Sequence, residues 1–197
     1  MTGMAPVVFT IGHSTHPIDR FVALLKQNGI AALADVRSTP FSRFNPQFNR
    51  ERLSAALNAE GIDYLFLGKE LGARSDDPAC YEGNQVQYDR LAATPAFKEG
   101  LARVEQEAGE RAVALMCAEK DPLHCHRTIL VGRELERRGF VLRHILADGG
   151  VEAHDTALNR LMKQHDLPSG DLFASREGLV EEAYRRQGDA IAYRRKA

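Results

Sequence analysis

Five short apolar runs rich in β-branched residues alternate along the chain with segments of helical periodicity, and this alternation most constrains the fold. Each run has the length of a buried β-strand. Parallel strands need long crossover connections, which helices usually supply. The alternation therefore predicts an α/β fold with a mainly parallel sheet, whose strands are PVVFTIG, IAALADV, IDYLFL, RAVALMC and FVLRHIL.

Helical patterns with start and stop residues fill the connections between these runs. The first begins at Pro17, repeats apolar residues at helical spacing and ends at Asn28-Gly29, so it predicts a helix over 17–28. Further helices are predicted over 49–60, 94–109, 122–138 and 151–165. Together the elements predict a three-layer, doubly wound, Rossmann-like fold with a five-stranded sheet in the order 3-2-1-4-5, strands being numbered along the chain.

Length and composition fit one cytoplasmic domain. At 197 residues the chain suits a single core, which we assign to 1–167, with 168–197 as a helical or mobile tail. Three cysteines are too few for a disulfide scaffold, and neither a signal peptide nor an apolar run of ~18 residues is present, so no membrane partner is expected. The net charge of −1 gives no global case for nucleic-acid binding. The long connection 67–93 is predicted to form a flap.

Polar residues follow three of the predicted strands at their carboxyl ends. His13, Ser14 and Thr15 follow the first strand, Asp35 and Arg37 follow the second, and Cys117 and Glu119 follow the fourth. In open α/β sheets, ligands usually bind at this edge, where the strand order reverses. The sequence therefore predicts that these groups meet in one crevice.

An anion is the ligand that this crevice predicts. Asp121 caps a helix that begins at Pro122, and the positive end of that helix would face the crevice. Arg37 and Arg127 would each grip a phosphate or carboxylate with two parallel hydrogen bonds, and Arg43 adds a third cation. The alternative is that the two arginines pair with Asp35 and Glu119 in a structural network.

The cysteines and Glu119 leave further alternatives open. Cys117 is either a nucleophile or a small buried apolar residue, and the same choice holds for Cys125. Glu119, directly after a buried strand, either has a charged partner or acts as a general acid or base. A metal at Cys117, His124, Cys125 and His126 would need His13 or His16 as an outside ligand. Neighbouring residues on a helix point about 100° apart, so no metal site is predicted.

Four segments, in order TIGHST, ADVRSTPFSRFNPQF, GIDYLFLGKELGA and LMCAEKDPLHCHR, closely resemble the family known as domain of unknown function 488 (DUF488). The resemblance covers about 7–165 and implies an α/β domain with no established reaction. Ala73 departs from the family, which usually has a second glycine there. The family's motif residues correspond in this chain to Gly12, His13, Ser14, Thr15, Asp35, Arg37, Pro40, Leu71, Gly72, Cys117, Glu119, Pro122, Cys125, His126 and Arg127.

A weaker likeness to rhodaneses and cysteine phosphatases is carried by the order of Cys117, Arg127 and the following helix. Those enzymes hold a thiolate in a short loop of backbone amides. Here Glu119 and Asp121 would place negative charge in that loop, and the step from Cys117 to Arg127 is too long for it. The details argue against the likeness.

Three functions remain open on the sequence. The first is a small enzyme acting on an anionic ligand such as a nucleotide or nucleic-acid component, with Glu119, Cys117, Asp35 and His13 as catalytic candidates. The second is a cysteine-dependent sulfur-transfer or phosphatase-like enzyme. The third is a ligand-sensing or nucleic-acid-binding module without turnover. No cofactor is indicated. The ligand-binding candidates are Gly12, Ser14, Thr15, Arg37, Pro40, Arg43, Cys125, His126 and Arg127.

Overall fold

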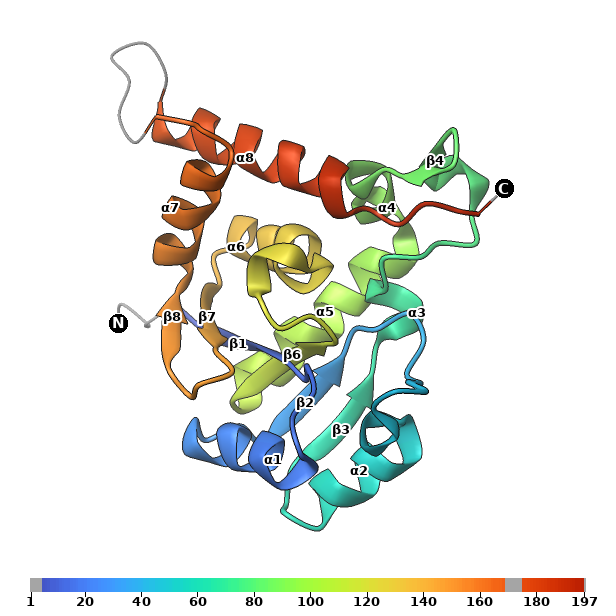
Figure 1. Cartoon of the computed structure of the whole chain (residues 1–197), viewed down its shortest axis with the longest axis vertical. Helices are drawn as coiled ribbons and strands as arrows, with labels where there is room; N and C mark the ends of the chain where they lie inside the picture. Colours follow the sequence, from blue (N-terminus) through green and yellow to red (C-terminus); the bar gives the residue numbers. More distant parts are fainter. Residues whose placement is uncertain (1–4, 169–174, 197) are drawn as a thin grey trace.

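The computed structural model of the chain describes residues 5–168 and 175–196, and its centre is a six-stranded sheet (Figure 1). Five strands are parallel and agree with the five predicted runs, while the short β8 pairs antiparallel with β7 at one edge. The predicted α/β class is confirmed. The strands are β1 (Val7–Gly12), β2 (Ala32–Asp35), β3 (Asp63–Phe66), β6 (Val113–Cys117), β7 (Val141–Ile145) and β8 (Val151–Ala153).

The predicted strand order was wrong in one place. The sheet runs β3-β2-β6-β1-β7-β8, so the fourth predicted strand, β6, lies between β2 and β1. All five residues of β6 are buried, as expected for a central strand that is covered on both faces. The Rossmann-like assignment rested on the predicted order and is not confirmed. The carboxyl ends of β2, β6 and β1 are nevertheless neighbours.

Helices cover both faces of the sheet (Figure 1). On one face α1 (Ile18–Gln27) and α2 (Arg50–Asn58) pack through their apolar sides against Leu33, Ala114 and Met116. Alternate strand residues point to the other face, where the larger core lies. That core receives α3 (Gly68–Leu71), α4 (Tyr88–Ala93), α5 (Pro95–Glu110), α6 (Arg133–Arg137), α7 (His154–Gln164) and α8 (Arg176–Ile191).

The single helix predicted over 122–138 is instead broken into three pieces. Asp121 caps a short 3₁₀ turn, Pro122–His124, by accepting a hydrogen bond from Leu123 N–H. Cys125 is then extended, with φ −140° and ψ 139°. A π-helical turn, Arg127–Gly132, follows and leads into α6. The helical segment that begins at Pro122 is therefore only one turn long, and it is not the long helix whose positive end was predicted to face the crevice.

The connection predicted as a flap, 67–93, has secondary structure of its own. Besides α3 and α4 it contains a 3₁₀ turn, Pro78–Cys80, and a small hairpin of β4 (Tyr81–Glu82) and β5 (Gln85–Val86). The chain after α8 returns to this hairpin, where Val86 N–H donates to the Tyr193 carbonyl oxygen (3.0 Å). One side of the cavity described below is built from this connection.

The last segment joins the main core. In α8, Val180, Ala183 and Tyr184 are buried against the same cluster as α7. Within the predicted tail, residues 176–191 form the helix α8, while 169–174 and 197 lie outside the described residues. Among the described residues, no helix combines the length and apolar character needed to cross a membrane.

Candidate functional site

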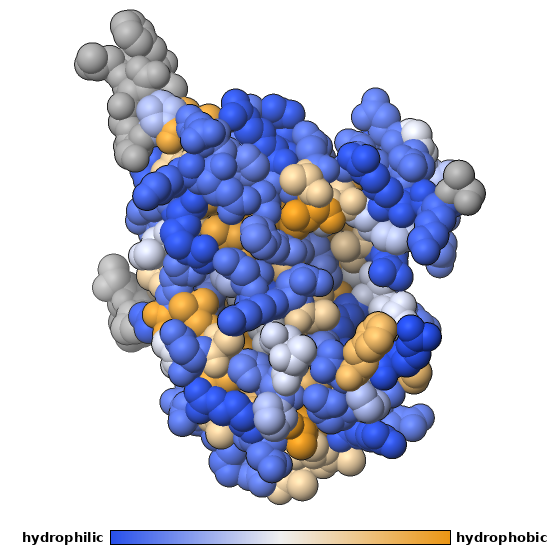
Figure 2. Space-filling model, in the orientation of Figure 1, coloured by the Kyte–Doolittle hydropathy of each residue, from blue (hydrophilic) through white to orange (hydrophobic). Residues whose placement is uncertain are grey.

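A cavity of 480 Å³ lies at the carboxyl ends of β1 and β6, beside the segment that follows β2. Six of the predicted site residues line it, from three segments that are far apart in the sequence: His13, Arg37, Cys117, Glu119, Cys125 and His126. Of the seven groups that we predicted to meet in one crevice, the structure brings His13, Arg37, Cys117 and Glu119 to this cavity, whereas Ser14, Thr15 and Asp35 do not line it. The face of the molecule shown in Figure 2 is mostly hydrophilic, with scattered apolar residues.

Arg37 lines the cavity, but two of its five guanidinium N–H groups bind the carboxylate of the buried Asp35. Nε donates to Asp35 Oδ1 at 2.9 Å, and Nη2 donates to Asp35 Oδ2 at 2.6 Å and to the Phe48 carbonyl oxygen at 2.8 Å. Tyr64 O–H donates to the same carboxylate at 2.7 Å. Asp35 is fully buried and does not line the cavity. The structural ion pair, one of the two alternatives for Arg37, is therefore present.

His13 is held as a neutral imidazole at the end of β1. Its Nδ1 lies 2.9 Å from the Ser14 carbonyl oxygen, which can only accept, so Nδ1 carries hydrogen. Nε2 is then free to accept from Arg37 Nη1 at 3.3 Å. The pKa of His13 is lowered from 6.5 to about 4, chiefly by burial; the hydrogen bond to Ser14 opposes this shift and the Arg37 charge adds to it. The ring stacks on Phe48, which fixes its orientation.

Cys117, Cys125 and His126 form a compact cluster on the cavity wall. His126 Nδ1 lies 3.7 Å from Cys117 Sγ and 3.9 Å from Cys125 Sγ. On the opposite side of the ring, Nε2 donates to the Val36 carbonyl oxygen at 2.9 Å. Because Cys125 is extended rather than helical, its side chain and that of His126 converge. The argument that neighbouring helical residues diverge therefore does not apply here.

The two thiols of the cluster ionise unequally. Burial opposes ionisation of Cys125, but the hydrogen bond from Cys117 and the nearby Arg127 and His126 hold the pKa of Cys125 well below its ordinary value. The same hydrogen bond, together with burial, raises the pKa of Cys117 well above its ordinary value. Contact with Cys125 raises the pKa of His126, although burial lowers it. Negative charge on the cluster is therefore placed on Cys125.

Arg127 and Gly12 hold the loop that follows β6. Arg127 is buried, and its Nη1 donates to the Glu119 carbonyl oxygen at 2.7 Å. A Cβ on Gly12 would overlap that same carbonyl oxygen, so only glycine permits this approach. Neither residue lines the cavity. In the structure the Arg127 guanidinium donates hydrogen bonds to backbone carbonyl oxygens. Its role as an anion anchor stays a prediction.

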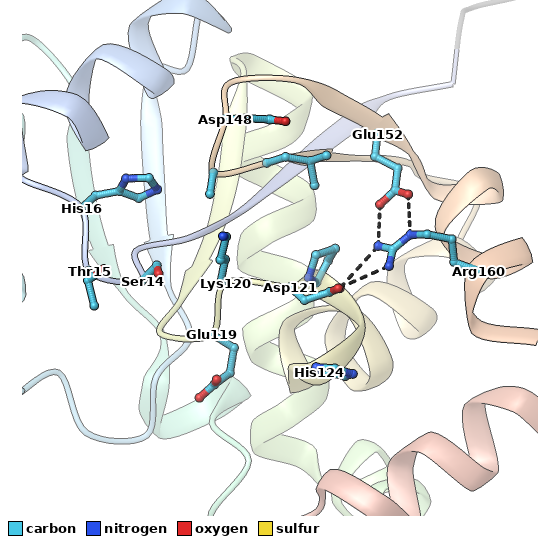
Figure 3. A pocket seen from close by; sticks show the side chains of 13 residues that line it. Ser14, Thr15, His16, Glu119, Lys120, Asp121, His124, Asp148, Glu152 and Arg160 are labelled. Carbon is cyan, nitrogen blue, oxygen red and sulfur yellow. Dashed lines mark hydrogen bonds and ion pairs between the residues drawn. The ribbon is translucent and has the colours of Figure 1, made fainter. Parts of the chain in front are cut away.

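Glu119 has an exposed side chain rather than a buried one. We expected either a charged partner or a catalytic role for Glu119, because burying an unpaired carboxylate is costly. Since the side chain is exposed, that cost does not arise. Glu119 and His124 also line a second cavity of 1090 Å³, next to the first. Ser14 and Thr15 line this second cavity (Figure 3) and do not line the first.

Ion pairs neutralise much of the charge in the second cavity. Arg160 donates to Glu152 at 2.8 and 2.9 Å and reaches Asp121 at 3.3 Å, as the dashed lines in Figure 3 show. The Glu119 side chain points away from these pairs. We therefore take the smaller cavity as the candidate site.

Several lining residues escaped the sequence analysis. Arg74 and Tyr88 come from the 67–93 connection, and Tyr193 comes from the chain after α8. Arg74 stacks on Tyr193 with 4.7 Å between its guanidinium carbon and the ring centroid. Arg74 directly follows GIDYLFLGKELGA, a segment that carries the family resemblance, and this position could have identified it. The sequence contains no such signal for Tyr193. Pro40 and the exposed Arg43, both predicted ligand residues, do not line this cavity.

Comparison with known proteins places the chain in a family. A family model described as "Domain of unknown function DUF488" matches residues 17–133, more than half of the chain. The matched span includes three of the four segments that carry the resemblance and all three residues of the cysteine cluster, and TIGHST precedes it. None of the curated proteins or solved structures compared with the chain matches it. The chain therefore belongs to the DUF488 family.

Proposed function

We propose that this protein is a small enzyme that binds an anionic ligand, such as a nucleotide or another phosphate ester, in the 480 Å³ cavity. The observation that carries the proposal is the meeting of His13, Arg37, Cys117, Cys125 and His126 on one wall of that cavity. A cavity in which polar and titratable groups converge is the first place to expect a ligand.

Two cations face the ligand volume. The guanidinium of Arg37 has five N–H groups, of which Asp35, Phe48 and His13 take four, so one remains for a ligand. Arg74 lies on the rim, where it stacks on Tyr193 and has no ion pair among the described residues. We expect Arg74 to supply the stronger contact, because its fork is not engaged by a carboxylate.

Glu119 is the proposed general acid or base. Its exposed carboxylate lies on the rim two residues after Cys117 and lines the same cavity. A carboxylate in that place is available to exchange protons with a ligand without unfolding the loop. His13, held neutral and turned toward Arg37, would position that arginine rather than exchange a proton.

The anion site is tested by thermal shift with inorganic phosphate, nucleotides and sugar phosphates. A ligand at ~100 times its Kd stabilises the native state by about 2.7 kcal/mol. Arg74→Gln should weaken the best ligand by roughly 10- to 100-fold, the loss of one charge-assisted hydrogen bond. The matched control is Arg52→Gln on the exposed side of α2, which should bind normally. Equal affinity in both variants would remove Arg74 from the site.

Turnover separates the enzyme from a binding module. Ligands that pass the first screen are incubated with the protein, and products are measured by mass spectrometry and phosphorus NMR. Glu119→Gln should keep the ligand affinity and lose at least about 100-fold in kcat, the usual contribution of a general acid or base. A ligand that binds tightly and is never converted would favour the non-catalytic module instead.

Thiol chemistry at Cys117 or Cys125 is a second candidate, favoured by the imidazole of His126 at 3.7 and 3.9 Å from the two sulfurs. It predicts that iodoacetamide modifies one of these thiols in the native protein faster than the buried Cys80 and abolishes turnover. Full turnover after modification would exclude it.

A further inference from the structure

The geometry of Cys117, Cys125 and His126 points to a metal site, and we propose that these three residues bind one Zn²⁺ ion with a fourth position open to the 480 Å³ cavity. Their ligand atoms all lie within 4.8 Å of one another, and all three residues are buried. The inference adds a cofactor to the cavity and does not require the anionic ligand of the preceding proposal.

The distances agree with tetrahedral coordination. Zinc binds thiolate sulfur at about 2.3 Å and imidazole nitrogen at about 2.0–2.1 Å, so a tetrahedral angle separates sulfur from nitrogen by about 3.6 Å. The two Sγ to Nδ1 distances here are 3.7 and 3.9 Å. The three side chains therefore already surround a volume of the right size.

The hydrogen bond from Cys117 to Cys125 accounts for only part of this arrangement. Nε2 of His126 donates to the Val36 carbonyl oxygen at 2.9 Å. In the neutral ring, Nδ1 then has one lone pair, which can accept a hydrogen bond from only one of the two thiols. A cation between the three atoms uses that lone pair and both sulfurs at once.

The surroundings match what supports a zinc ligand set. A carbonyl oxygen on the far nitrogen, as Val36 provides, fixes the ring and its tautomer in metal sites. The Arg127 backbone N–H lies 3.5 Å from Cys125 Sγ and would stabilise its thiolate. Two thiolates balance the charge of Zn²⁺, so the buried cluster would be neutral. Two sulfurs and one imidazole favour zinc over magnesium or calcium, which take oxygen ligands.

The fourth position would face the cavity. His13, the outside ligand considered from the sequence, has both nitrogens engaged by the Ser14 carbonyl and Arg37. A site with three protein ligands and a free position is typical of catalytic rather than structural zinc. Water bound there would have a pKa near 7, and the carboxylate of Glu119 lines the same cavity. The site would thus supply activated water to the proposed enzyme.

Metal analysis and cobalt substitution test the inference. The whole protein is purified under reducing conditions, its zinc content is measured, and the metal-free form is titrated with CoCl₂. We expect one equivalent of Zn²⁺ per chain, and a cobalt spectrum with a thiolate charge-transfer band and the intense visible bands of tetrahedral coordination. Zn²⁺ should displace the cobalt.

Cysteine variants locate the ion. Cys117→Ser and Cys125→Ser should each weaken Zn²⁺ binding by at least ~100-fold and remove or shift the charge-transfer band, with folding checked by circular dichroism. Cys80→Ser is the matched control, because Cys80 is equally buried but outside the cluster. Wild-type protein that binds neither ion stoichiometrically, or Cys80→Ser with the same loss, would overturn the inference. Failure of the anion screen would leave both results unchanged.

Discussion

Gly12 shows at the scale of one residue how the site loop is held in place. The end of β1 and the Glu119 carbonyl approach so closely that a Cβ at position 12 has no room, and Arg127 donates a hydrogen bond to the same carbonyl oxygen. Because Gly12 belongs to TIGHST, one of the segments that carry the family resemblance, we predicted that it contacts a ligand. In the structure Gly12 packs against the Glu119 carbonyl oxygen and does not line the cavity.

Gly12→Ala is expected to lower the free energy of unfolding by about 1–3 kcal/mol, since the added methyl group must displace backbone atoms. Gly109→Ala is the matched control, because Gly109 lies near the end of α5 and has nothing within 4 Å of the added atom. There the change should stabilise by up to about 1 kcal/mol. Urea unfolding of both variants checks the prediction, which fails if Gly12→Ala is as stable as the wild type.

At the scale of elements, the segment 121–137 shows where prediction from sequence stops. The cap at Asp121 and the proline at 122 were correctly identified as a helical start. Nothing in the local pattern marks Cys125 as extended, because that conformation depends on the long-range hydrogen bond from His126 to the Val36 carbonyl. Cys117, Cys125 and His126 were all candidate site residues, but the argument against a metal among them assumed a continuous helix at 125–126.

The helix α8 offers a prediction about how far the core extends. Val180, Ala183 and Tyr184 are buried with α7, and Gln187 donates to the Leu123 carbonyl at 2.8 Å. A chain that ends at residue 168 should have a free energy of unfolding lower by about 3–5 kcal/mol, since the core surface that packs against Val180 and Tyr184 becomes exposed. Urea unfolding measures the loss. An unchanged urea midpoint would contradict this prediction and mean that α8 does not stabilise the core.

At the scale of the whole molecule, the five parallel strands and both helical layers followed from periodicity, whereas the order of the strands did not. β1 and β2 follow each other in the chain but are not neighbours in the sheet. β6 lies between them, and it comes much later in the chain, after the long segment that ends with α5. Periodicity reports which residues are buried, and it does not report which distant strand they pair with. The carboxyl ends that form the site are adjacent in either order.

A buried histidine chain makes the stability of the fold dependent on pH. His144 Nδ1 lies 2.8 Å from Thr10 Oγ1, and its Nε2 lies 2.9 Å from His154 Nδ1, which places β1, β7 and α7 in one network. Burial lowers the pKa of His144 well below 6.5; the nearby His154, Arg127 and Arg160 lower it further, and Asp121 opposes them. The native state therefore excludes the proton that the unfolded chain binds below pH 6.5.

This contribution to stability is complete above pH 6.5 and is lost as the pH falls toward the lowered pKa of His144. Urea unfolding at pH 7.5, 6.5 and 5.5 should give a decreasing free energy of unfolding. His144→Asn should be less stable at pH 7.5 and show a shallower decrease, because one titrating group is gone. His13, whose pKa is also lowered, adds to the slope in both proteins. Equal slopes in wild type and variant would contradict the assignment.

The central claim is that Cys117, Cys125 and His126 form one metal site on the cavity wall, and a crystal structure of the reduced protein with anomalous data on both sides of the zinc edge tests it most directly. The account predicts a zinc peak bonded to Cys117 Sγ, Cys125 Sγ and His126 Nδ1, open to the cavity beside Arg37 and Glu119. A disulfide between the two cysteines, or three side chains that point apart with no peak between them, would contradict it.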